Sequence, residues 1–214
     1  LQYGAGTATF FQHNVTDEEE WKRVLAEIQQ AHGRLDILVN NAGIMKPGSI
    51  VDTELADWKQ VNAVNVESQF LACKHALSLM EASGEGGSII NMSSTSMLVG
   101  MSHIAAYSAS KGAVDALTRN VAAHCIEAGN GVRVNSIQPD GVKTPLIVKM
   151  ATGKDSASDD EMAMLDAEQI DWILPEDIAN TVLFLASNDS RCINGISILI
   201  DKGVCMLPQT PRAS

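Results

Sequence analysis

Residues 16–40 have the sequence TDEEEWKRVLAEIQQAHGRLDILVN, an amphipathic segment followed by a short apolar run. The segment opens with a capping box, in which Thr16 is the predicted N-cap and Glu19 follows three residues later, and Gly33 ends it. Apolar residues recur at i, i+3, i+4 and i+7 and predict a helix over 16–32: Trp21, Val24, Leu25 and Ile28. The run at 35–40 has the composition of a strand covered on both faces. A helix that leads directly into a buried strand is the repeating unit of a parallel α/β sheet.

The same alternation continues through the rest of the chain. Further strand candidates lie at 8–15, 88–92, 132–137 and 196–201, and amphipathic helices are expected at 54–82, at 105–128 and from Pro175 onward. We therefore predict an α/β fold, a doubly wound and mostly parallel sheet with helices on both faces, in which residues 1–214 form a single domain. Within it, residues 146–172 are rich in small, acidic and Met residues with weak periodicity, which favours a mobile substrate lid.

Charge and composition exclude several classes of function. Fifteen Lys and Arg residues against 26 Asp and Glu residues give the 214-residue chain a formal net charge of −11. Because nucleic-acid affinity depends on clustered cations, we expect no nucleic-acid partner. The four cysteines are scattered without metal-ligand spacing, so we expect no metal site. The sequence has neither a long apolar run nor a basic segment leading into an apolar one, so we expect no membrane association and a cytoplasmic location.

Three side chains form the strongest candidate for a catalytic site. Tyr107 and Lys111 are separated by one helical turn near the start of the predicted helix 105–128, so both emerge on one face. Ser94 follows the strand candidate 88–92, at the edge of the sheet where open α/β folds bind ligands. A nearby ammonium favours the phenolate and lowers the pKa of a tyrosine, which suits Tyr107 to proton transfer. The Ser94 hydroxyl could hold a substrate oxygen in line with that transfer.

These residues lie in motifs that resemble those of the short-chain dehydrogenase/reductase family. NNAG at 40–43 follows a strand candidate, VNAVNVES at 61–68 contains Asn65, INMSS at 90–94 ends at Ser94, and AYSASK at 106–111 contains Tyr107 and Lys111. The resemblance spans nearly the whole chain and ends with NGISILID at 194–201, which is similar to the last strand of the family. It implies a Rossmann-like fold and a homodimer or homotetramer that pairs helices 54–82 and 105–128.

The resemblance also implies an activity: hydride transfer between NAD or NADP and a secondary alcohol or ketone. Tyr107 would be the acid/base, and Lys111 would lower its pKa and hold the nicotinamide ribose. Ser94 would position the substrate oxygen, and Asn65 would anchor a proton relay by holding Lys111 through water. The apolar residues Met97, Leu98, Val99 and Met101 follow Ser94, and they could line a pocket for a hydrophobic or steroid-like substrate or simply pack in the core.

Further positions match the cofactor contacts of the family. By resemblance, the nicotinamide would meet Pro139, Val142 and Thr144 of the turn PDGVKTP at 139–145. The remaining contacts would come from the ends of two strands: Asn14, Val15, Asn41, Ala42 and Gly43. Asp140 departs from the glycine that is usual in the family, although PDG is similar to bacterial 3β/17β-hydroxysteroid dehydrogenases. Asn14 stands where the family usually has Asp, and an asparagine can still contact the adenine edge.

The first part of the family pattern, a strand followed by a TGxxxGxG phosphate loop and a second strand, is absent from this sequence. We therefore expect the domain to be N-terminally incomplete, a piece of a longer polypeptide. The alternative is a non-catalytic binding or oligomerisation module of the same fold that lacks the phosphate loop. Four polar groups at catalytic spacing favour the enzyme.

Overall fold

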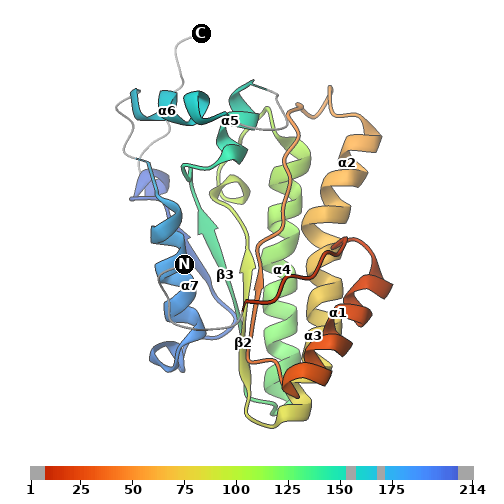
Figure 1. Cartoon of the computed structure of the whole chain (residues 1–214). Coiled ribbons are helices and arrows are strands. Elements are labelled where there is room, and N and C mark those ends of the chain that lie inside the picture. The colour runs from red at the N-terminus through yellow and green to blue at the C-terminus, as the bar shows by residue number, and fades with distance from the viewer. Residues whose placement is uncertain (1–7, 153–157, 168–171, 207–214) are drawn as a thin grey trace.

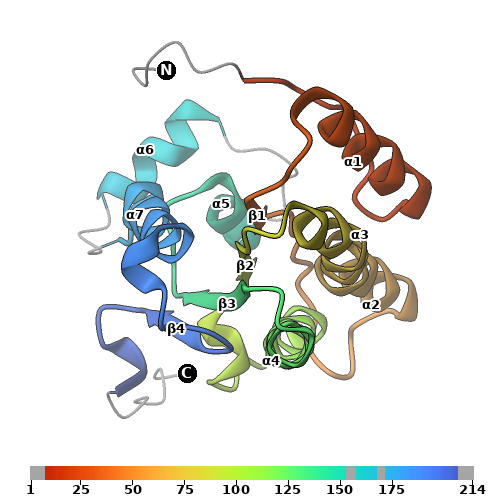
Figure 2. The same cartoon turned by 90° about the horizontal axis from the view of Figure 1, so that it is seen from below.

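The computed structural model describes residues 8–152, 158–167 and 172–206. Its centre is a sheet of four parallel strands, β1 (Ile37–Asn40), β2 (Gly87–Met92), β3 (Val132–Pro139) and β4 (Ser197–Ile200), in the order β1-β2-β3-β4. Figure 2 shows the strands side by side, with helices on both faces. This arrangement confirms the predicted α/β fold with a parallel sheet.

Two long helices, α3 (Ser68–Ser83) and α4 (Ala105–Ala128), cover one face of the sheet, and α7 (Pro175–Ala186) covers the other (Figures 1 and 2). The helix α1 (Glu18–His32) packs on the outside of α3 through Trp21 and Leu25. Two short helices, α5 (Pro145–Thr152) and α6 (Asp159–Ala167), lie together at one end of the molecule (Figure 1). Within the described ranges, no helix combines the length and the apolar character that a membrane crossing requires.

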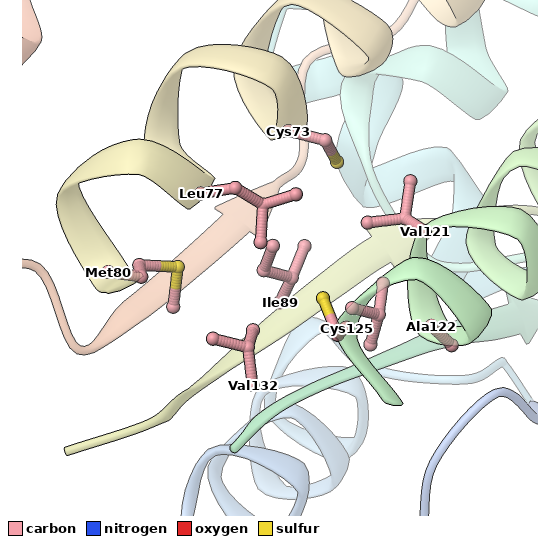
Figure 3. Close-up of a cluster of buried hydrophobic side chains, with 9 residues drawn as sticks. Cys73, Leu77, Met80, Ile89, Val121, Ala122, Cys125 and Val132 are labelled. Carbon is pink, nitrogen blue, oxygen red and sulfur yellow. The ribbon is translucent and has the colours of Figure 1, made fainter. Parts of the chain in front are cut away.

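The main hydrophobic core lies between the sheet and the pair α3 and α4 (Figure 3). Leu77 and Met80 come from α3, Val121 and Cys125 from α4, and Ile89 of β2 is completely buried beneath them. Burial of apolar side chains from all three elements fixes α4 against the strands. This packing holds the start of α4, and with it Tyr107 and Lys111, beside the carboxyl end of β2.

Several predicted boundaries agree with the structure. The helix 105–128 coincides with α4, and Pro175 is the first residue of α7. Gly33 ends α1 in the left-handed conformation, with φ 74°. The N-cap of α1 is Asp17 and not Thr16, because the Asp17 carboxylate accepts hydrogen bonds from the backbone N–H groups of Glu19 and Glu20.

The predicted strand 8–15 is wrong. Residues 8–14 have no regular structure, and Phe10 is 87 % exposed. A strand requires a hydrogen-bonded neighbour, and in the described part of the chain β1 pairs with β2 alone. The segment is held by local contacts instead, such as the hydrogen bond that Arg23 donates to the Gln12 carbonyl.

The predicted helix 54–82 consists of three pieces. The helix α2 (Leu55–Asn62) continues through a π-helical turn, η1 (Ala63–Glu67), into α3. Such turns insert one extra residue into an α-helix and often occur at functional sites. Here the turn contains Asn65, whose side chain is fully buried.

Candidate active site

The carboxyl ends of the strands open into a pocket of about 790 Å³. The ends of β1, β2 and β3, together with α4, α5 and α7, contribute to its walls. The polar lining residues that were predicted from sequence are Asn41, Ser94, Tyr107, Lys111 and Thr144. The structure therefore brings together side chains that are more than one hundred residues apart in the sequence.

Ser94 and Tyr107 both line this pocket. Ser94 is the N-cap of a short 3-10 helix, η2 (Thr95–Met97), and its hydroxyl accepts a hydrogen bond from the Ser96 N–H at 3.2 Å. Burial raises the pKa of Tyr107, and a hydrogen bond with Ser94 partly opposes that rise. The net shift is opposite to the expected lowering, because removal of the phenol from water outweighs its favourable contacts.

Lys111 lies one turn further along α4 and is only 3 % exposed. Its Nζ atom donates a hydrogen bond to the Met92 carbonyl at 2.7 Å and lies 5.4 Å from the centre of the Tyr107 ring. Burial lowers the pKa of Lys111 to about 8, and the negative charge of Asp115 opposes this shift. The ammonium is thus anchored at the end of β2, beside the phenol that it was predicted to activate.

Asn65 is placed by the π-helical turn and bridges three elements. Its amide accepts a hydrogen bond from the Ile44 N–H at 2.8 Å and donates to the Ile44 carbonyl at 2.9 Å. It also donates to the Ser110 hydroxyl on α4 at 3.0 Å. The Asn65 side chain therefore ties the loop after β1 to α4 through direct contacts.

The predicted cofactor contacts divide into two groups. Six line the pocket together with Tyr107: Asn41, Gly43, Lys111, Pro139, Val142 and Thr144. Ala42 is exposed between Asn41 and Gly43 but is not part of the lining. Asn14 and Val15 also lie outside the pocket, since the Asn14 carbonyl oxygen Oδ1 accepts from Thr16 in a local turn and Val15 packs against the α1–α3 cluster.

Asp140, the departure from the family pattern, links two loops of the site. Its carboxylate accepts a hydrogen bond at 2.9 Å from the Thr95 hydroxyl, which directly follows Ser94. A glycine at this position could not make that bond. The loop after β2 and the loop after β3 are thereby joined at the pocket wall.

Sequence reasoning missed much of the apolar wall. Met101 was expected there and lines the pocket, whereas Met97, Leu98 and Val99 do not. The apolar lining residues that were not named from the sequence as pocket residues are Met45, Met92, Ile104, Leu146, Ile147, Ile178, Val182 and Leu183. An amphipathic pattern predicts which face of α7 is covered, but not whether a protein core or a ligand covers it.

Known proteins resemble this chain in both sequence and fold. A family profile described as "Enoyl-(Acyl carrier protein) reductase" matches residues 2–205. The chain is 39 % identical over 198 residues to the 3-beta-hydroxysteroid dehydrogenase of Comamonas testosteroni. The aligned region covers 91 % of this chain and 76 % of that protein. The chain belongs to the short-chain dehydrogenase/reductase family.

Two further members of this family support the assignment. The NADP-dependent (R)-specific alcohol dehydrogenase of Lentilactobacillus kefiri is 33 % identical over 201 residues, covering 94 % of this chain and 78 % of that protein. Ligand-free aldohexose dehydrogenase of Thermoplasma acidophilum has a TM-score of 0.84 at 27 % identity, covering 99 % of this chain and 84 % of that one. The protein is accordingly an NAD(P)-dependent short-chain dehydrogenase that acts on alcohols.

The pocket fits the nicotinamide end of such a cofactor. A Cβ atom at Gly43 would lie 3.6 Å from the Lys111 Nζ atom and 3.5 Å from the Asn65 Oδ1 atom, so the glycine leaves the space beside the ammonium open. Hydrogen bonds between described residues use one of the three N–H donors of Lys111. The groups that would hold the cofactor are Asn41, Lys111, Val142 and Thr144, which all line the pocket.

Proposed function

We propose that this dehydrogenase interconverts a hydrophobic, steroid-like secondary alcohol and its ketone. The observation that carries the proposal is the character of the pocket around Ser94 and Tyr107. Ligand pockets usually measure about 300–1,000 Å³ and combine apolar walls with a few placed polar groups. Here much of the wall is built from methionine and aliphatic side chains of the strand ends, α5 and α7, and Ser94, Tyr107 and Lys111 are among the polar groups that line the same pocket.

The proposed mechanism assigns one role to each polar residue. A nicotinamide cofactor held by Lys111, Asn41, Val142 and Thr144 would supply the hydride-transfer chemistry for the alcohol carbon. Tyr107 takes the hydroxyl proton in oxidation and donates it in reduction, and Ser94 holds the same oxygen by a hydrogen bond. Lys111, as a cation, favours the Tyr107 phenolate and binds the ribose. Asn65 fixes the loop after β1 against α4 and supports the proton relay.

The predicted lid over residues 146–172 is part of the proposal. Leu146 and Ile147 of α5 line the pocket, and α6 packs against α5. Residues 153–157 and 168–171 of the predicted lid lie outside the described residues. We propose that α5 and α6 cover the substrate and exclude water during hydride transfer. A lid with apolar residues on its inner side would favour an apolar substrate.

We also propose that the enzyme forms a homodimer or homotetramer through its long helices. Exposed apolar side chains on α3 and α4 support this: Phe70 is 49 % exposed and Ile126 is 66 % exposed. Exposed apolar surface on a helix is commonly buried by association. Light scattering after size-exclusion chromatography tests the assembly, and a monomer at all concentrations would contradict it.

The first test of the proposed function has two stages. Titration with NADH and separately with NADPH, with nicotinamide fluorescence as the readout, measures cofactor binding. We propose NAD as the cofactor, with NADP as the alternative. Initial rates are then measured with 3β-hydroxysteroids, small secondary alcohols and aldohexoses. We expect the hydroxysteroids to have the highest kcat/KM. Turnover of aldohexoses or small alcohols in preference to steroids would contradict the proposal.

A further inference from the structure

Asp115 is a buried carboxylate that the proposed mechanism does not use. It lies on α4, one turn after Lys111 and two turns after Tyr107, and is 1 % exposed. Its two oxygens are held from β3: the Ser136 hydroxyl donates to Oδ1 at 2.8 Å, and the Gln138 amide donates to Oδ2. The three side chains therefore continue along one stripe of α4, from the pocket into the protein interior.

A buried negative charge is costly unless a positive charge and hydrogen bonds compensate it. Ser136 and Gln138 supply hydrogen bonds but no charge. The neighbouring cation is Lys111, which is itself 3 % exposed and has the same need. In the described ranges Asp115 forms no ion pair within 4.0 Å, so the two charges act on each other through the low-dielectric interior.

Burial and the charge of Asp115 have opposite effects on the pKa of Lys111. Burial lowers the pKa of Lys111 from 10.5 to about 8, and the charge of Asp115 acts in the opposite direction. Without Asp115 the pKa of the lysine would fall further, towards the physiological range. The cation that the proposed mechanism requires would then be partly lost near neutral pH.

Other charged groups around α4 do not take this place. Tyr107 faces Lys111 as a buried neutral phenol, and Asp140, also on the pocket wall, accepts a hydrogen bond from Thr95. Charged groups on the packed elements engage other partners. On α2, Asp57 pairs with Lys46, and on α3, Lys74 and His75 pair with Glu18 while Glu81 accepts a hydrogen bond from Asn130. On β3, Arg133 donates hydrogen bonds to the carbonyls of Leu185 and Ser187. Glu67 of η1 has no direct contact with Lys111 among those found between described residues.

We propose that Asp115 is a positioning residue that keeps Lys111 protonated in the buried site, and that Ser136 and Gln138 hold its carboxylate in place for this purpose. The Gln138 amide also contacts the Met97 sulfur at 3.4 Å, so the same arrangement ties β3 to the helical turn that follows Ser94. The catalytic consequence rests on the proposed role of Lys111, whereas the coupling of the two charges does not.

The test follows the titration of Lys111 directly. Protein labelled with 13C at the lysine Cε atoms is titrated by NMR, and the Lys111 signal is assigned by its loss in Lys111→Met. In Asp115→Asn we expect the Lys111 midpoint to move down by about one pH unit, the size of shift that a charge one turn away produces inside a protein. The asparagine retains the shape of the site, and Gln138 can rotate its amide to accept from it.

The matched control is Asp201→Asn. Asp201 is also buried, at 6 % exposed; it directly follows β4 and accepts backbone hydrogen bonds from Gly203 and Cys205. This variant changes the net charge equally, so it should leave the Lys111 midpoint in place. An unchanged midpoint in Asp115→Asn, or an equal shift in both variants, would overturn the proposal.

A second measurement uses the native protein and so does not depend on the folding of a variant. In the native protein the Lys111 midpoint should lie at about 8, and a Lys111 side chain that titrates at the ordinary 10.5 would overturn the proposal. The pH dependence of NADH binding separates the two hypotheses. If Asp115→Asn shifts the Lys111 titration but leaves the pH dependence of NADH affinity and turnover unchanged, the coupling stands and the proposed role of Lys111 fails.

Discussion

Burial of Lys111 should make the stability of this enzyme depend on pH, and substitution by methionine should remove that dependence. The pKa of Lys111 falls from 10.5 in the unfolded chain to about 8 in the folded protein. Between these values the unfolded chain binds a proton that the folded protein does not, so the free energy of unfolding rises with pH. A difference of 10.5 − 8 = 2.5 units corresponds to about 3 kcal/mol at ~1.4 kcal/mol per unit.

Urea denaturation at about pH 7 and about pH 10 measures this effect. Other groups titrate in the same range, but they contribute equally to the native protein and to Lys111→Met. The stability of the native protein relative to the variant should therefore increase by about 2–3 kcal/mol between the two conditions. Lys59→Met, at an exposed position on α2, is the matched control and should show no such change. Parallel pH profiles for the native protein and Lys111→Met would refute the argument that burial depresses the lysine.

Three further predictions concern the site and the core. Tyr107→Phe should abolish turnover while NADH affinity remains largely intact, because only the transferable proton is lost; ordinary turnover in this variant, measured by NADH absorbance, contradicts the proposed role. Lys111→Ala should weaken both NADH binding and turnover, since the ammonium is proposed to touch both the ribose and the phenol, and an unchanged Kd would argue against that contact. Ile89→Ala should lower the free energy of unfolding by about 2–5 kcal/mol, because Ile89 is completely buried between the sheet and two helices. A loss below about 1 kcal/mol in urea denaturation would mean that the core closes over the gap.

Local patterns were sufficient wherever an element is specified by its own residues. The helix 105–128 was predicted with both ends correct, since its apolar face and Gly129 are local signals. The shift of the α1 cap from Thr16 to Asp17 shows the limit of such signals, because adjacent polar residues compete for the same backbone N–H groups. The strand prediction at 8–15 failed for a different reason: a strand depends on a neighbour, and composition alone does not supply one.

The candidate site shows the same division. Ser94, Tyr107 and Lys111 could be chosen from spacing and resemblance, because their roles require particular residue types at particular distances along the chain. Asp115 was not chosen, although the sequence places it one turn after Lys111, because an acidic residue on a helix is usually a solvated surface residue. Its importance follows from its burial against Ser136 and Gln138, which come from a strand more than twenty residues away.

The sequence by itself determined the alternation of helices and strands, the parallel sheet that follows from it, and the residue types at the end of β2 and the start of α4. These depend on periodicity, capping and short spacings, which are properties of neighbouring residues. Only the tertiary structure decided which side chains are removed from water, and therefore that the pKa of Tyr107 rises, that the pKa of Lys111 falls to about 8, and that Asp115 faces inward. Burial is a property of the packed elements together, because a side chain loses its hydration only when residues from distant parts of the chain cover it.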